Sequence, residues 1–142
     1  MANKKILIVE DDSDIRKAMS VRLKASGYDT FVASDAITSL IMARKHEPDL
    51  IILDLGLPAG DGFVVIERLK TVPALALIPI VVVSGRSDLP NQQLALEAGV
   101  KAFLQKPVDN AELLAVIQKT LGGPVELETP AYLSKPARNF LL

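Results

Sequence analysis

Cysteine is absent from the 142-residue sequence, and histidine occurs once, at His46. Without cysteine, disulfides, zinc–thiolate sites and thiol catalysis are all excluded. A single histidine excludes a histidine-rich metal site. Because His46 falls near the end of a predicted helix, we expect an exposed imidazole there with no special function.

A strong charge of either sign and long hydrophobic runs are also absent. The formal net charge is −1 and no long basic run occurs, which argues against nucleic-acid binding as the main work of the chain. The longest apolar runs, such as Ile78 to Val83, are far too short to span a bilayer. The basic N-terminus leads into a strand-length apolar run without a small-residue cleavage site. We therefore expect a cytoplasmic chain that does not enter a membrane.

Hydrophobic residues alternate between strand-like and helix-like spacing along the chain. Short apolar runs predict five strands, over 6–9, 28–33, 50–53, 80–83 and 102–104. A helix-like pattern follows each run, and the second helix is expected to end before His46 because Pro48 comes soon after. Five strands that alternate with five helices predict an α/β fold, a doubly wound parallel sheet with helices on both faces.

The pattern changes near the end of the chain. Residues 1–121 are long enough to bury one core and are predicted to form one domain. From 122 onward three prolines interrupt a segment without helical period, so 122–142 is interpreted as a C-terminal tail or linker.

Polar residues follow most of the predicted strands at their carboxyl ends. They are Glu10, Asp11 and Asp12 after the first strand, Asp54 after the third, Ser84 after the fourth and Lys106 after the fifth. In a doubly wound sheet, ligands bind beyond the carboxyl ends of the strands, so we expect these side chains to meet. Taken singly, each has an ordinary explanation as a loop residue or, for Asp12, a helix cap. Their joint placement is what predicts a site.

The residue types at this site favour phosphoryl chemistry with Mg²⁺. Clustered carboxylates repel one another unless a counter-charge is present, and a hard divalent cation with oxygen ligands supplies it. Such an ion leaves positions for phosphate oxygens, while Lys106 adds a positive charge and Ser84 a hydroxyl donor. An aspartate held there can act as the nucleophile and form an acyl phosphate.

Four stretches of the sequence closely resemble the response-regulator receiver family of bacterial two-component systems, over about residues 4–121. The stretches are ILIVEDD at 6–12, LDLGLP at 53–58 with DG at 61–62, VSG at 83–85 and AGVKAFLQKP at 98–107. The resemblance implies a receiver domain over 1–121 with the flavodoxin-like (βα)5 fold of the chemotaxis protein CheY. Its five parallel strands would lie in the order 2-1-3-4-5.

The resemblance also implies how each residue is used. Asp54 corresponds to the phosphoacceptor, and Ser84 and Lys106 to the residues that bind the phosphoryl group. Phe103 corresponds to the aromatic switch residue, although a simple core phenylalanine is an equal alternative. The Lys106–Pro107 peptide bond is expected to be cis.

The same resemblance implies the metal ligands. Asp11, Asp54 and the backbone carbonyl of Gly56 would bind Mg²⁺ directly, and Glu10 would act mainly through water. The acidic pair is then Glu10 and Asp11, with Asp12 outside it.

The implied function is a phosphorylation-dependent signalling switch. The phosphoryl group would come from a sensor histidine kinase or a phosphotransfer protein in a Mg²⁺-dependent reaction, and the partner-binding surface would change. Such a chain is not an enzyme beyond catalysing its own phosphorylation and dephosphorylation. Its downstream partner or fused output domain stays open, and receivers commonly form homodimers through the fourth helix, fifth strand and fifth helix.

The alternative from another class is a haloacid-dehalogenase-like Mg²⁺-dependent phosphatase, which also has an aspartate nucleophile. That family has a second aspartate two residues after the nucleophile, where this sequence has Gly56. It also often carries a cap domain, for which this chain has no room.

Overall fold

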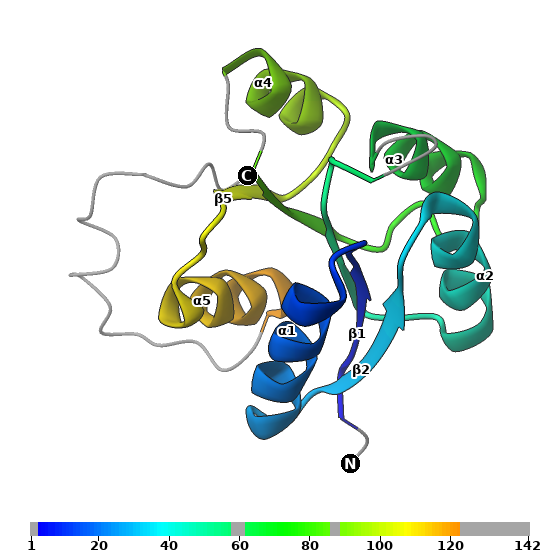
Figure 1. Cartoon of the computed structure of the whole chain (residues 1–142). Helices are drawn as coiled ribbons and strands as arrows, with labels where there is room; N and C mark the ends of the chain where they lie inside the picture. The colour runs from blue at the N-terminus through cyan, green and yellow to red at the C-terminus, as the bar shows by residue number, and fades with distance from the viewer. Residues whose placement is uncertain (1–2, 58–61, 86–88, 123–142) are drawn as a thin grey trace.

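The computed structural model of the chain describes residues 3–57, 62–85 and 89–122. Within these ranges five parallel strands form one sheet in the order β2-β1-β3-β4-β5, with helices on both faces (Figure 1). The doubly wound α/β fold and its strand order are as predicted. The predicted tail lies outside the described residues, apart from Gly122.

The strands in the interior of the sheet are buried along almost their whole length. The strands are β1 (Lys5–Val9), β2 (Asp29–Ala33), β3 (Leu50–Leu53), β4 (Ile80–Ser84) and β5 (Ala102–Gln105). Every residue of β3 and β4 is buried. Helices cover both faces of a parallel sheet, which explains why these strands are continuous apolar runs.

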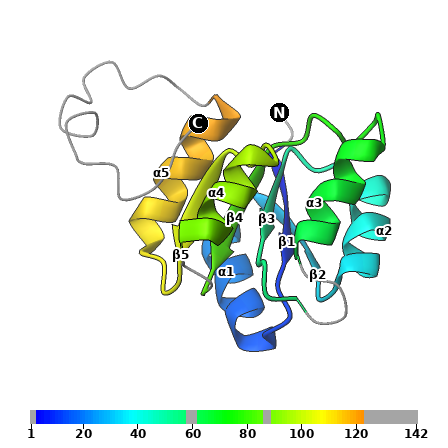
Figure 2. The ribbon, with the colours of Figure 1, turned by 90° about the horizontal axis from the view of Figure 1, so that it is seen from above.

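Two hydrophobic cores lie on opposite faces of the sheet, because successive strand side chains point to opposite faces. One core contains side chains of α1 (Ser13–Ala25) and α5 (Asn110–Leu121). The other contains side chains of α2 (Ala36–His46), α3 (Gly62–Thr71) and α4 (Leu89–Glu97). Figures 1 and 2 show α2 and α3 side by side on that second face.

Aspartates at strand-to-helix turns begin several helices. Asp12 is the N-cap of α1 and accepts hydrogen bonds from the backbone N–H groups of Asp14 and Ile15 at 2.9 and 3.1 Å. Asp109 caps α5 in the same way through the N–H of Glu112. The cap at Asp12 agrees with the ordinary explanation that the sequence offers for that residue, and each cap satisfies backbone N–H groups in the first turn of its helix.

Two expectations about His46 are wrong. Helix α2 includes His46, because Pro48 restricts only the residue before it, and Glu47 takes up that restriction in a left-handed conformation with φ of 48°. The imidazole is also only partly exposed, since it stacks on Phe31 with ring centroids 3.9 Å apart.

None of the helices in the described ranges has the length and apolar character needed to cross a bilayer.

Candidate functional site

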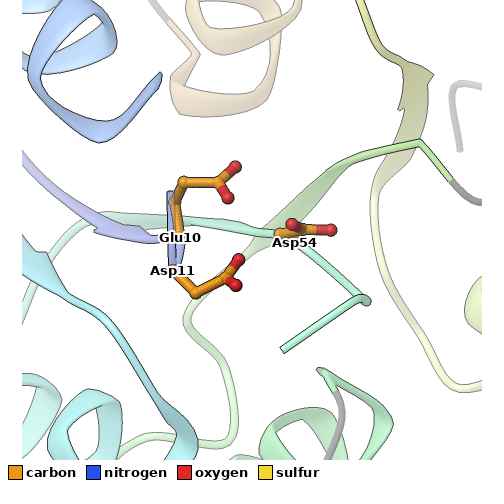
Figure 3. A group of neighbouring side chains, drawn as sticks. All are labelled: Glu10, Asp11 and Asp54. Atoms are coloured by element: carbon orange, nitrogen blue, oxygen red, sulfur yellow. The ribbon is translucent and has the colours of Figure 1, made fainter. Parts of the chain in front are cut away.

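Three carboxylates meet at the carboxyl ends of β1 and β3, from Glu10, Asp11 and Asp54 (Figure 3). One oxygen from each lies within 4.8 Å of the others. Glu10 and Asp54 are 2% and 7% exposed, whereas Asp11 is exposed. Like-charge repulsion makes a cluster of this kind unfavourable, and such clusters are candidates for functional sites.

The sheet register brings the cluster together. Val9 pairs with Leu53, so the next residues along each strand, Glu10 and Asp54, lie level with each other. The ladder continues through these residues, because the Asp54 N–H donates to the Val9 carbonyl and the Glu10 N–H donates to the Ala33 carbonyl, both at 3.0 Å. Backbone pairing therefore fixes where both carboxylates begin.

Asp54 has a partner on each carboxylate oxygen. Oδ1 accepts from the Gly56 N–H at 2.9 Å, and Oδ2 accepts from Lys106 Nζ at 3.1 Å. Burial by itself raises the pKa of Asp54, but the Gly56 N–H and the Lys106 ammonium outweigh it and hold the pKa below the ordinary value. Asp54 is therefore an ionised carboxylate near neutral pH, as a nucleophile must be.

The ammonium group of Lys106 forms salt bridges with two carboxylates. Its Nζ lies 2.6 Å from Glu10 Oε1 as well as 3.1 Å from Asp54 Oδ2. Burial lowers the pKa of Lys106, but its hydrogen bonds to Glu10 and Asp54 raise it more, and the net pKa lies above the ordinary value. For Glu10 burial has the larger effect: it raises the pKa more than Lys106 lowers it, so the net pKa lies above the ordinary value. On acidification, Glu10 takes up a proton before Asp54.

Ser84 and Phe103 lie on the neighbouring strands β4 and β5. Ser84 is fully buried at the end of β4, and its carbonyl accepts from the Lys106 N–H at 3.0 Å. Phe103 is 2% exposed within the core between the sheet and α2, α3 and α4. This placement agrees with a core phenylalanine. The Lys106–Pro107 peptide bond is cis, as expected from the family resemblance.

Arg16 also belongs to this site, although sequence reasoning did not single it out. Its Nη1 donates to the Glu10 carbonyl at 2.8 Å and to the Asp11 carbonyl at 3.4 Å. The signal in the sequence is only its spacing, one turn into the helix that follows the acidic pair. Asp12, in contrast, uses its side chain to cap α1 and is not one of the three clustered carboxylates.

The donor set fits a magnesium ion. When all three carboxylates are ionised, they and the Lys106 ammonium together carry a net charge of −2, which one divalent cation neutralises. Carboxylate oxygens are the ligands that Mg²⁺ prefers, and Asp11 is exposed where an ion could enter. Gly56 lies in the turn after Asp54, is exposed and has a carbonyl as a further oxygen donor.

Residues 6–118 match the family described as the response regulator receiver domain. The KDP operon transcriptional regulatory protein KdpE of Escherichia coli is 39% identical over 116 residues, 82% of this chain and 50% of that protein. The DNA-binding dual master transcriptional regulator RpaA of Synechocystis is 36% identical over 117 residues, again 82% of this chain and 48% of that protein. The chain thus spans about half the length of these curated relatives.

Solved structures resemble the fold over most of the chain. The chemotaxis response regulator CheY4 of Vibrio cholerae is 27% identical with a TM-score of 0.78, covering 83% of this chain and 98% of its own. The receiver domain of a sensor histidine kinase of Pseudomonas aeruginosa is 26% identical with a TM-score of 0.79, covering 86% and 100%. That structure has a magnesium ion coordinated in its active site cleft.

Proposed function

The chain belongs to the response-regulator receiver family, and we propose that its phosphoacceptor is Asp54, so that phosphorylation at this residue sets a signalling switch. The observation that carries the proposal is the contact of the buried, ionised Asp54 carboxylate with Lys106 at 3.1 Å, beside two further carboxylates. The family match gives no support to the haloacid-dehalogenase alternative.

The proposed reaction transfers a phosphoryl group from a phosphohistidine of a donor protein. One oxygen of Asp54 attacks the phosphorus, the P–N bond to the imidazole breaks, and the imidazole nitrogen keeps the electron pair. The product is an acyl phosphate on Asp54. Lys106 supplies positive charge to a phosphoryl oxygen. The hydroxyl of Ser84, a buried residue in the last pair between β4 and β5, donates to another phosphoryl oxygen.

The proposal includes Mg²⁺ as cofactor, held directly by Asp11, Asp54 and the Gly56 carbonyl, with Glu10 acting through water. When bound, the ion neutralises charge on the transferring phosphoryl group. Support comes from the three oxygens within 4.8 Å of one another and from the named magnesium in the related Pseudomonas receiver domain.

The switch itself would act through Ser84 and Phe103. Ser84 ends β4 and Phe103 lies on the adjacent β5, where it pairs with Val82. A Ser84 hydroxyl drawn toward a phosphoryl group would open space for a ring that is otherwise packed in the core. The surface formed by α4, β5 and α5 would then change for a downstream partner, a fused output domain or a second copy of the chain.

The phosphoryl donor would be a sensor histidine kinase or a phosphotransfer protein in the cytoplasm. A cavity of about 470 Å³ between α1 and α5 gives such a donor a place to dock beside the site. It is lined by Ile15, Ala18, Met19, Arg22, Val83, Lys106, Pro107, Val108, Asn110 and Leu113. A mainly apolar surface next to Lys106 suits a donor helix that carries an exposed histidine.

Asp54→Asn tests the proposal. The wild-type chain should gain the mass of one phosphoryl group when treated with acetyl phosphate and Mg²⁺, and Asp54→Asn should gain none. Asp12→Asn is the matched control, because asparagine preserves the cap of α1, and it should be labelled like the wild type. Equal labelling of the Asp54→Asn variant and the wild type would overturn the assignment.

A further inference from the structure

Arg16 contacts the backbone of both residues of the acidic pair. It is the fourth residue of α1, and its Nη1 donates to the Glu10 carbonyl at 2.8 Å and to the Asp11 carbonyl at 3.4 Å. The guanidinium group thus joins the helix to the turn that presents two of the three clustered carboxylates.

The first turn of a helix is an unfavourable place for a cation. The helix dipole puts partial positive charge there, and the acidic Asp12 and Asp14 at the start of α1 follow that preference. Arg16 is an exception that its hydrogen bonds explain. Charge-assisted bonds are roughly twice as strong as neutral ones, and one of them reaches the carbonyl of Glu10, which is 2% exposed.

The contacts of Arg16 go to backbone oxygens and leave the carboxylates free for other ligands. The Glu10 carboxylate is held separately, by Lys106 Nζ at 2.6 Å and by the Asp12 N–H at 3.2 Å. Arg16 therefore restrains the backbone of Glu10 and Asp11, whereas Lys106 restrains the carboxylate of Glu10. Without the first restraint, repulsion among three carboxylates would push the turn outward.

We propose that Arg16 is a positioning residue for the divalent-cation site: it clamps the turn between β1 and α1 so that Asp11 and Glu10 stay within reach of Asp54. The inference rests on the proposed Mg²⁺-dependent function. Arg16 touches neither the ion nor the phosphoryl group, so its loss weakens ion binding without removing a ligand. Residues that orient metal ligands typically change metal affinity about 10- to 100-fold when mutated.

Calorimetric titration of the full chain with MgCl₂ tests the proposal on Arg16→Ala. The expected result is a Mg²⁺ dissociation constant raised about 10-fold over the wild type. At saturating Mg²⁺, the rate of phosphorylation by acetyl phosphate should return to within about twofold of the wild type, because the reacting groups are intact. Lys24→Ala, which removes an exposed positive charge from the last turn of α1 and lies outside the cavity lining, should leave the dissociation constant unchanged.

Arg16→Lys separates positioning from simple charge. Lysine keeps the charge but lacks the planar guanidinium, so it should recover only part of the lost affinity. Full recovery in Arg16→Lys, or wild-type affinity in Arg16→Ala, would overturn the clamp. Because Arg16→Lys keeps the charge and most of the side-chain bulk, it gives a reading even if Arg16→Ala folds poorly. If wild-type protein itself neither binds Mg²⁺ nor is labelled at Asp54, the proposed function fails first, and the clamp fails with it.

Discussion

Lys106 Nζ lies between two buried carboxylates, 2.6 Å from Glu10 and 3.1 Å from Asp54, so one positive charge favours the ionised form of both. Breaking such a pair by removing one partner leaves an uncompensated buried charge. Substitution of Lys106 is therefore expected to change the pKa values of Glu10 and Asp54.

Lys106→Met should raise the pKa of Asp54. Burial already favours the neutral acid, and the substitution removes one of the two main interactions that favour the carboxylate. In the wild type the depressed pKa contributes stability above the ordinary value of 3.8, and this contribution is lost as the pH falls through the folded-state pKa. The Lys106→Met variant should lose this contribution to stability at a higher pH than the wild type does. Carboxyl ¹³C NMR titration measures the pKa, and urea unfolding at several pH values measures the stability.

Lys101→Met is the control for this experiment, since Lys101 is exposed and lies just before β5. It should leave the pKa of Asp54 where it is in the wild type. An unchanged Asp54 titration in Lys106→Met would show that the ammonium does not govern the site.

Asp11→Asn should weaken Mg²⁺ binding at least about 10-fold, since it removes one of three anionic oxygens, a change of about 1.4 kcal/mol or more. Asp12→Asn should hardly matter, because the Asp12 side chain accepts two backbone N–H bonds that asparagine can also accept. Calorimetric titration compares the two variants. If Asp12 proves to be the stronger ligand, the acidic pair is shifted by one residue from our assignment.

At the scale of elements, the sequence predicts the strands better than the helix ends. The runs at 50–53 and 80–83 correspond to β3 and β4 to within one residue, because burial on both faces leaves no other pattern. The apolar spacing by itself indicates a helix over 91–98, whereas α4 runs over Leu89–Glu97. Pro90 suits the first turn of a helix, where its missing N–H costs nothing, so the helix begins earlier than its apolar spacing indicates.

The site was predictable to the extent that topology determines it. Strand ends that carry polar residues meet at one edge once the strand order is known, and this brings Glu10, Asp54 and Lys106 together. The contacts of Arg16 were not predictable in the same way, because a side chain that reaches backbone carbonyls leaves no residue pattern beyond spacing. The stacking of His46 on Phe31 was not predicted either, because it joins two side chains that are far apart in the sequence.

The start of α3 is coupled to Asp54 through close packing. A Cβ atom at Gly62 would lie 2.7 Å from the Asp54 carbonyl oxygen and 2.7 Å from the Leu55 Cα, both of them backbone atoms that cannot rotate away. Gly62→Ala should therefore cost about 1–3 kcal/mol of folding free energy and slow phosphorylation, because the backbone of Asp54 must shift. Urea unfolding and acetyl phosphate labelling check the two effects.

Gly85→Ala is the stability control for this substitution, since a Cβ there meets nothing within 4 Å. It should leave the free energy of unfolding within about 0.5 kcal/mol of the wild type. If Gly62→Ala were equally harmless, α3 would be free to move away from the strand end, and the coupling to Asp54 would be absent.

At the scale of the whole molecule, the proposed function gives the two faces of the sheet different roles. Ser84 and Phe103 are both buried, and Phe103 belongs to the core under α2, α3 and α4, so the proposed switch would change the packing on that face. The cavity between α1 and α5 lies on the other face and includes Lys106 in its lining. In the proposal, a donor protein would dock between α1 and α5 and a downstream partner on α4, β5 and α5, so the two surfaces share α5.

The last prediction separates docking from chemistry. Ala18 lies on the exposed side of α1 and lines the cavity, so Ala18→Trp should obstruct a docking protein without touching Asp54. Transfer from a phosphohistidine donor protein that labels the wild-type chain should slow about 10-fold, which corresponds to about 1.4 kcal/mol. Labelling by acetyl phosphate, a small donor that needs no docking surface, should be unchanged. Val21→Trp, on the same helix at a residue that is 67% exposed and outside the cavity lining, should behave as the wild type in both assays. Equal slowing of both donors by Ala18→Trp would mean that the substitution disturbs the site itself, and unchanged transfer from the protein donor would place the docking surface elsewhere.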